Sequence, residues 1–224
     1  MWQEVLVAAK KKIAVYGAGG FAREVAWLLS KHQNYDIYDM IGFIEDDAEP
    51  GRSLNGKPVL SWQSFLPYSD SLVTVAIGDP QSRKKVVGKC ANAGFPFATL
   101  IHHTVEMSEF VELGAGSIIC CGSVLTVNIK IERHVHINLD CTLGHDVHIG
   151  EFTTLSPGVH VSGNVRIGKC VYIGTGATII NGTSESPLEV ADGTIIGAGA
   201  CITKSTESNC LYAGVPAELK KRYL

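Results

Sequence analysis

The sequence contains no continuous stretch of about 18 apolar residues, so it predicts no membrane-spanning helix. Its apolar run at residues 5–9 precedes a basic cluster and is too short for the core of a secretory signal. Neither sign of charge dominates, because 19 basic and 22 acidic residues give a net charge of −3. This balance excludes a general binder of nucleic acids or anionic membranes. We therefore expect a cytoplasmic protein with no nucleic-acid partner and no membrane insertion.

The sequence also lacks a disulfide or zinc framework. Its seven cysteines are odd in number and include no C-x-x-C pair, which predicts reduced and mostly packed thiols. At 46% hydrophobic and 18% charged residues, the 224-residue chain has the composition of a globular protein with one or two domains. Glycine is unusually frequent, with 24 residues that fall mostly after residue 110.

A sixfold repeat fills the second half of the chain. Every sixth position carries an aliphatic side chain: Ile101, Met107, Leu113, Ile119, Leu125, Ile131, Ile137, Leu143, Ile149, Leu155, Val161, Ile167, Ile173 and Ile179. Small and β-branched residues recur between them. Short strands joined by tight turns, with each aliphatic side chain stacked on its equivalent in the next coil, are typical of a parallel β-helix built from hexapeptides. The period is interrupted at residues 181–189 and resumes at Val190, which predicts a loop leaving the solenoid.

The first hundred residues predict a different domain. A short strand at Ile13–Tyr16 leads through the glycine turn Gly17–Gly20 into an amphipathic helix at Phe21–Lys31. This order is the opening of a Rossmann-like unit, although the third glycine of its usual motif is replaced by Ala22. We therefore place an α/β domain at residues 1–100 and the β-helix with its C-terminal tail at residues 101–224.

Further strands are predicted at Met40–Ile44, Leu72–Ile77 and Phe97–Ile101, with a helix at Gln81–Ala93. The first two end in polar turns that contain Glu45, Asp46 and Gly78. Because the carboxyl ends of parallel strands meet at one edge of a sheet, these residues and the glycine turn predict a ligand crevice. A solvated turn explains the acidic residues equally well.

The motifs VYGAGGFAREV, GFIEDD, VAIGDPQSRKK, HINLDCTLGHDVHIGEF, VSGNVRIG and IIGAGACITK occur in this order over nearly the whole chain. In this the sequence resembles the bacterial nucleotide-sugar acetyltransferases, which include bacillosamine and perosamine N-acetyltransferases and sialic-acid O-acetyltransferase relatives. The resemblance implies a left-handed β-helix that binds acetyl-CoA and an α/β domain that binds a nucleotide-linked amino sugar (UDP, GDP or dTDP). It also implies a homotrimer with active sites between subunits and no required metal.

The resemblance assigns roles to particular residues. His145 is implied as the general base, with Asp146 as its acidic neighbour and Asn138 in the active site. Residues implied near the pantetheine arm of the cofactor are Gly163, Gly197, Ala198 and Gly199. Residues implied in the nucleotide pocket are Gly17, Gly19, Glu45, Asp46 and Gly78. The chain departs from the family at Thr154, where some members have a second active-site histidine, and in the inserted residues 181–189.

The chemistry suits an imidazole. An amine that attacks a thioester must lose a proton, and a neutral imidazole can accept it near neutral pH, while an adjacent carboxylate fixes the tautomer. A polar turn residue is the alternative interpretation of His145. The other histidines are expected on exposed faces or at subunit contacts: His102, His103, His134, His136, His148 and His160.

Other functions remain open at this point. One alternative is a sugar O-acetyltransferase of the sialic-acid type. Another is a β-helix zinc carbonic anhydrase, but the chain lacks the His-x4-His pair of those enzymes, and His145 and His148 are only three residues apart. A nucleotidyltransferase with an appended β-helix would need a much longer first domain. A scaffolding solenoid would have no need of the His-Asp pair.

Overall fold

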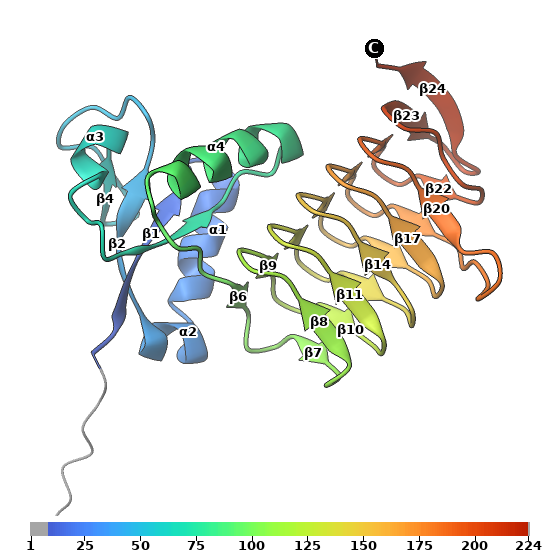
Figure 1. The fold of residues 1–224 in the computed structure, drawn as a ribbon, viewed down its shortest axis with the longest axis horizontal. Helices are drawn as coiled ribbons and strands as arrows, with labels where there is room; N and C mark the ends of the chain where they lie inside the picture. The colour runs from blue at the N-terminus through green and yellow to red at the C-terminus, as the bar shows by residue number, and fades with distance from the viewer. Residues whose placement is uncertain (1–8, 224) are drawn as a thin grey trace, which may run out of the picture.

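A computed structural model describes residues 9–223, so the first eight residues of the predicted α/β domain lie outside the described part. The chain forms an α/β head followed by a β-helix, and the head lies beside the N-terminal coils while the later coils extend away from it (Figure 1). The predicted fold class is confirmed. Within residues 9–223, no helix has the length and apolar character needed to cross a membrane.

The head is a five-stranded sheet in the order β3-β4-β2-β1-β5, in which only β3 and β4 are antiparallel. Its strands are β1 (Lys11–Tyr16), β2 (Tyr38–Ile44), β3 (Ser53–Leu54), β4 (Lys57–Leu60) and β5 (Leu72–Val75). Its helices are α1 (Gly20–Leu29), α2 (His32–Ile37), α3 (Trp62–Phe65) and α4 (Pro80–Asn92). The predicted strands and helices match β1, α1, β2, β5 and α4 within a few residues. The elements α2, α3, β3 and β4 were not among the predicted ones.

Alternation along β1 builds both sides of the head. Ile13 and Val15 pack with α1 in one buried cluster, while Ala14 and Tyr16 pack with α3 and α4 in another. Successive side chains of β1 are therefore buried on opposite faces of the sheet, as expected for a central strand with helices on both faces. The strands β2 and β5 lie on either side of β1, so the chain reverses direction across the sheet at the carboxyl end of β1. Open sheets of this kind bind ligands at that point.

The solenoid has three parallel sheets. The first sheet contains β6 (Leu100–Ile101), β9 (Ile118–Ile119), β12 (His136–Ile137), β15 (Thr154–Leu155), β18 (Tyr172–Ile173), β21 (Ile195–Ile196), β23 (Cys210–Ala213) and the antiparallel β24 (Glu218–Arg222). The second contains β7 (Glu106–Met107), β10 (Val124–Leu125), β13 (Thr142–Leu143), β16 (His160–Val161), β19 (Thr178–Ile179) and β22 (Cys201–Ile202). The third contains β8 (Val111–Leu113), β11 (Ile129–Ile131), β14 (His148–Ile149), β17 (Val165–Ile167) and β20 (Leu188–Val190).

The aliphatic repeat fills the interior of these coils. Partners in neighbouring coils are 18 residues apart, as in Val124 with Thr142, and the sixfold positions from Ile119 to Ile179 form one buried cluster. Met107 is an exception with 44% of its surface exposed, because β7 is the edge strand of its sheet. After β19, five extra residues enter the coil, so that Val165 pairs with Leu188. The predicted loop is therefore present, but it ends before Leu188 rather than after Glu189.

The predicted strand Phe97–Ile101 is wrong as a single element. Phe97 makes only an isolated bridge to Val73 of the head, whereas Leu100–Ile101 is β6 and pairs with β9 of the solenoid. The segment divides because its first part continues the head sheet and its second part begins the first coil.

Arg83 of α4 joins the head to the solenoid and is completely buried. Its guanidinium donates to the carbonyl oxygens of Ile77 (2.7 Å) and Gly78 (3.2 Å) in the head. It also donates to the Thr154 hydroxyl (2.9 Å) and the His134 carbonyl (3.1 Å) in the solenoid. Because burial removes the charge from water, the pKa of Arg83 is lowered to about 9.

Candidate active site

The predicted base and its acidic neighbour lie at the second corner of the solenoid, which is the turn that joins the second sheet to the third. His145 Nδ1 is 2.8 Å from Asp146 Oδ2, and both side chains are about half exposed. The hydrogen bonds from His145 and then Asn128 lower the pKa of the Asp146 carboxyl. A carboxylate on Nδ1 favours the tautomer with its proton there, which leaves Nε2 as the nitrogen able to accept one.

Gly163 lies one coil beyond His145 at the same corner. A Cβ on Gly163 would fall 2.4 Å from both Cε1 and Nε2 of His145, far inside ordinary contact. The glycine therefore provides the space in which the imidazole ring lies. Gly144 is equally constrained, since its Cβ would fall 2.7 Å from the backbone nitrogen of Gly163. The second corner consequently needs glycine at both levels of the stack.

Asn138 lies at the first corner, the turn that joins the first sheet to the second. Its side-chain amide donates to the Leu155 carbonyl at 2.6 Å, and only 8% of the residue is exposed. The predicted cofactor residues Gly197, Ala198 and Gly199 lie at this same corner, three coils further along, in the turn after β21. The structure therefore divides the predicted solenoid residues between two corners, with His145, Asp146 and Gly163 at one and the rest at the other.

The head places its predicted residues at the carboxyl ends of β1, β2 and β5. Gly17 has a φ of +117°, and its Cβ would lie 3.0 Å from the Ala76 carbonyl oxygen, so glycine is required where these strands end side by side. Gly19 caps the start of α1. The amides of a helix start attract anions, so this edge suits a diphosphate.

The two acidic residues that were predicted in the nucleotide crevice have different partners. Glu45 forms an ion pair with Arg52, whereas Asp46 accepts hydrogen bonds from Tyr16 and, at 2.5 Å, from Lys89 of α4. The ammonium of Lys89 and then the Tyr16 hydroxyl lower the pKa of Asp46. Burial and the hydrogen bond to Asp46 raise the pKa of Tyr16, so its hydroxyl stays protonated. Lys89 also lies 4.4 Å from the Trp62 ring centroid.

Lys89 and Trp62 were not predicted beside Asp46, because a charged helical residue and a lone aromatic residue carry no local signal of a site. Gly78 follows β5 at this edge of the sheet, but its carbonyl oxygen accepts hydrogen bonds from Arg83 and, at 2.7 Å, from the Thr154 hydroxyl. A separate cavity of about 460 Å³ lies at the opposite ends of the strands, with Lys10, Tyr38 and Lys57 in its lining.

The expectation that six histidines are exposed or at subunit contacts is wrong for three of them. His102, His134 and His136 are 2%, 5% and 0% exposed, because the head covers the first coils of the first sheet. Burial lowers the pKa of His134 to about 4 and that of His136 well below its ordinary value. Thr154, which replaces a family histidine, is also buried in this contact rather than facing the corner of His145.

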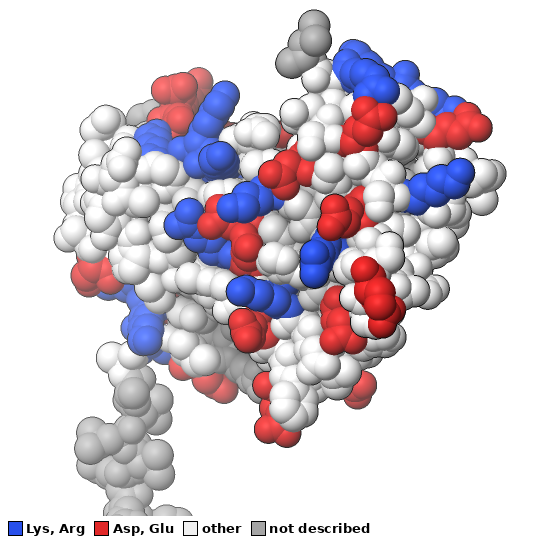
Figure 2. Space-filling model, turned by 45° about the vertical axis from the view of Figure 1, so that its right-hand side comes forward, with Lys and Arg blue, Asp and Glu red and all other residues white. Residues whose placement is uncertain are grey.

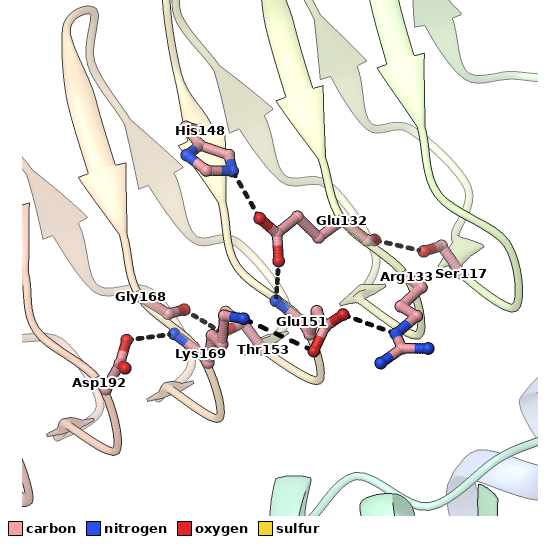
Figure 3. Close-up of polar contacts among 9 residues, drawn as sticks. All are labelled: Ser117, Glu132, Arg133, His148, Glu151, Thr153, Gly168, Lys169 and Asp192. Carbon is pink, nitrogen blue, oxygen red and sulfur yellow. Dashed lines mark hydrogen bonds and ion pairs between the residues drawn. The ribbon is translucent and has the colours of Figure 1, made fainter.

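The third sheet presents a charged surface. Its outward row consists of Glu112, Lys130, His148, Arg166 and Glu189. Beside this row Glu132 accepts from the Glu151 amide and contacts His148 Nε2, both at 3.1 Å, while Glu151 accepts from Arg133 (Figure 3). Acidic and basic side chains are intermixed across the face shown in Figure 2. A surface with such a mixture of charges favours contact with solvent over burial in an interface.

The comparisons with known proteins agree with this architecture. Residues 12–90 match the family described as the PglD N-terminal domain, and residues 146–181 match the bacterial transferase hexapeptide (six repeats). The chain is 33% identical over 211 residues to GDP-perosamine N-acetyltransferase of Escherichia coli O157:H7, which covers 93% of this chain and 96% of that protein. The chain belongs to the PglD-type nucleotide-sugar N-acetyltransferases.

Two solved structures support this membership. The acetyltransferase domain of PglB from Neisseria gonorrhoeae FA1090, in complex with acetyl coenzyme A, has a TM-score of 0.84 and 32% identity, and covers 95% of this chain and 100% of that one. PerB from Caulobacter crescentus, in complex with CoA and GDP-perosamine, has a TM-score of 0.83 and 28% identity, and covers 95% of this chain and 99% of that one. The predicted family is thus confirmed.

Membership in the PglD-type family bears on the alternatives. It replaces the carbonic anhydrase, nucleotidyltransferase and scaffolding interpretations with N-acetyl transfer. Within residues 9–223, no three His, Cys, Asp or Glu side chains lie close enough together to hold a metal ion.

Proposed function

We propose that this chain transfers the acetyl group of acetyl-CoA to the amino group of a nucleotide-linked 4-amino-deoxy sugar, with His145 as the general base. The observation that carries the proposal is the His145–Asp146 pair, which lies above a glycine that leaves room for the ring. Family membership supports an amine acceptor over a hydroxyl. The product would serve the synthesis of a surface glycan or glycoprotein.

In the proposed reaction the sugar nitrogen attacks the thioester carbonyl while His145 Nε2 accepts its proton. A carbon–nitrogen bond forms, the carbon–sulfur bond breaks, and CoA leaves as a thiolate that takes up a proton. Asp146 stabilises the imidazolium that exists in between, since its carboxylate is already bonded to Nδ1. No step requires a metal ion.

The nucleotide is proposed to bind in the crevice of the head, with its diphosphate at the Gly17–Gly19 turn. Asp46 and Lys89 would contact the nucleoside, since they form a partly exposed pair of opposite charges at the edge of the proposed crevice. The pantetheine arm is proposed to run along the coils past Gly197–Gly199. All seven cysteines are free, which supports a reducing compartment and hence the cytoplasm.

We further propose a homotrimer in which the second sheet faces the threefold axis. Its outward row is nearly neutral: Glu106, Val124, Thr142, His160, Thr178 and Cys201. Exposed apolar side chains border its first coils, with Phe110 60% and Val127 40% exposed, and a groove of about 470 Å³ is lined by Val124 and Val127. A neutral face with apolar residues is the better interface, and the charged third sheet is the worse.

This trimer would bring the predicted residues of the two corners together in one site. The first and second corners bound opposite edges of the second sheet, so His145 and Asn138 of one chain lie at opposite edges of one face. Around a threefold axis, the second corner of each subunit meets the first corner of its neighbour. His145 of one subunit would then act beside Asn138 and Gly197–Gly199 of the next.

Activity and mixing experiments test both proposals. With acetyl-CoA and a panel of UDP-, GDP- and dTDP-linked 4-amino sugars, H145A should lose at least about 10²-fold in kcat, as expected for a general base, and D146N should lose less. If each single variant H145A and N138A is inactive, an equal mixture after subunit exchange should regain about one quarter of wild-type activity. That fraction follows because three quarters of random trimers are mixed and each mixed trimer has one intact site of three. Normal turnover by H145A would refute the base, and an absence of recovery in exchanged trimers would refute the shared site.

A further inference from the structure

Three polar residues stack at the second corner in successive coils. Asn128, Asp146 and Asn164 are each 18 residues apart and have φ values of 54°, 58° and 56°. This left-handed conformation is costly for most residues, and asparagine, aspartate and glycine adopt it most readily. The backbone thus favours the same few residue types at all three positions, although another corner of this chain holds His134, Phe152 and Cys170 in the same conformation.

Only one of the two asparagines contacts the proposed catalytic pair. Asn128 Nδ2 donates to Asp146 Oδ1 at 3.2 Å, while the other oxygen, Oδ2, is 2.8 Å from His145 Nδ1. The side-chain amide of Asn164 makes no hydrogen bond to another residue in the described part of the chain. The carboxylate is therefore held between an amide from the preceding coil and the imidazole.

We propose that Asn128 is a positioning residue for the transfer reaction, acting through Asp146 on His145. Asp146 is about half exposed, and its carboxylate would rotate and exchange partners with water if nothing held its second oxygen. With the Asn128 amide on one oxygen, the other stays directed at Nδ1, and Nε2 stays in the space above Gly163. This inference rests on the proposed role of His145 as the base.

A purely structural role for Asn128 predicts a different outcome. In that case the side chain matters only because asparagine tolerates the left-handed turn. Glycine tolerates the same turn at least as well, so N128G removes the amide without straining the backbone. N164G is the matched control, since it makes the same change in the same conformation one coil beyond Asp146 and removes no side-chain hydrogen bond.

The test uses the full-length chain, acetyl-CoA and whichever nucleotide amino sugar the panel identifies. N128G should lower kcat about tenfold, the scale of one hydrogen bond to a charged group, while KM for both substrates stays within about twofold. N164G should keep kcat within about twofold, and neither variant should lower Tm. The double variant N128G/D146N should be no slower than D146N alone, because both changes break one chain of contacts.

The results separate this inference from the function on which it depends. If H145A is inactive but N128G has the kcat of N164G, Asn128 is not a positioning residue although the base stands. If N128G and D146N slow the enzyme by independent factors, Asn128 acts by some other route and the inference is equally refuted. If H145A remains active, the proposed base itself fails, whatever N128G does. Nitrogen NMR spectra of the His145 ring add a second readout. N128G should reduce the fraction of the ring that is protonated at Nδ1, whereas N164G should not.

Discussion

Substitution of Gly163 by alanine should disable the enzyme without unfolding it. Gly163 does not have a positive φ, so alanine imposes no backbone strain at this position. The new Cβ would lie 2.4 Å from His145 Cε1 and Nε2, about 1 Å short of the 3.4 Å at which ordinary contact begins. The ring is half exposed, so it can swing into solvent to relieve the overlap.

A displacement of about 1 Å at a reacting group can cost about 10²-fold in rate, and we expect a loss of that size in kcat for G163A. Thermal unfolding should change by only a few degrees, because nothing in the core moves. G168A is the informative contrast, since its Cβ would fall 2.7 Å from the backbone nitrogen of Asp192, which cannot swing away. That variant should have a lower Tm but near-normal kcat in the fraction that remains folded.

The assay is steady-state kinetics with each substrate varied in turn, together with thermal unfolding of both variants. The double variant G163A/H145A should be no slower than H145A, since the glycine acts only through the ring. Should G163A instead raise KM for acetyl-CoA at unchanged kcat, Gly163 would contact the pantetheine arm, as the family resemblance alone implies. In that case Gly163 does not act by leaving room for the His145 ring.

Three further predictions concern the head, the buried histidines and metals. D46A should raise KM for the sugar nucleotide and leave KM for acetyl-CoA unchanged, while the exposed neighbour substitution D47A changes neither; equal effects of D46A on both KM values would contradict the crevice. His134, whose pKa is lowered to about 4, takes up its proton on unfolding, so it destabilises the fold as pH falls from about 6.5 to about 4, by about 3 kcal/mol in full. H134Q should therefore lose less stability than wild type over this pH window in denaturant titrations, and identical curves for the two proteins would refute the assignment. Dialysis against EDTA should leave kcat within about twofold, since proton transfer to an imidazole needs no metal, and a loss restored by added zinc would overturn the mechanism.

The sequence predicted those features that depend on short-range pattern. The aliphatic period predicted the interior of every coil from Ile119 onward, and the glycine turn after β1 marked the edge of the sheet. The His145–Asp146 contact was predicted because the two residues are adjacent in the chain.

Features that depend on pairs distant in sequence were not predictable. Arg83 belongs to a run of three basic residues that would suit an exposed helix, yet its acceptors lie up to 71 residues away. The same contact buries His134 and His136, which the local pattern placed at the surface. Likewise, nothing in the repeat shows that Asn138 and His145 occupy different corners, because that depends on how many residues make one side of a coil.

The shared interior of head and solenoid limits how such enzymes can be recombined. Leu100, Ile118 and Cys120 pack within one cluster of the head, and Phe152 packs within the other. In a chimera joined at residue 101, the buried Arg83 of one enzyme would need hydrogen-bond acceptors from the solenoid of another enzyme, which did not evolve with it. A junction beyond Cys170, where the coils no longer contact the head, would keep this interior intact. Nucleotide specificity should therefore be transferred between enzymes with the head and the first coils together, rather than with the head alone.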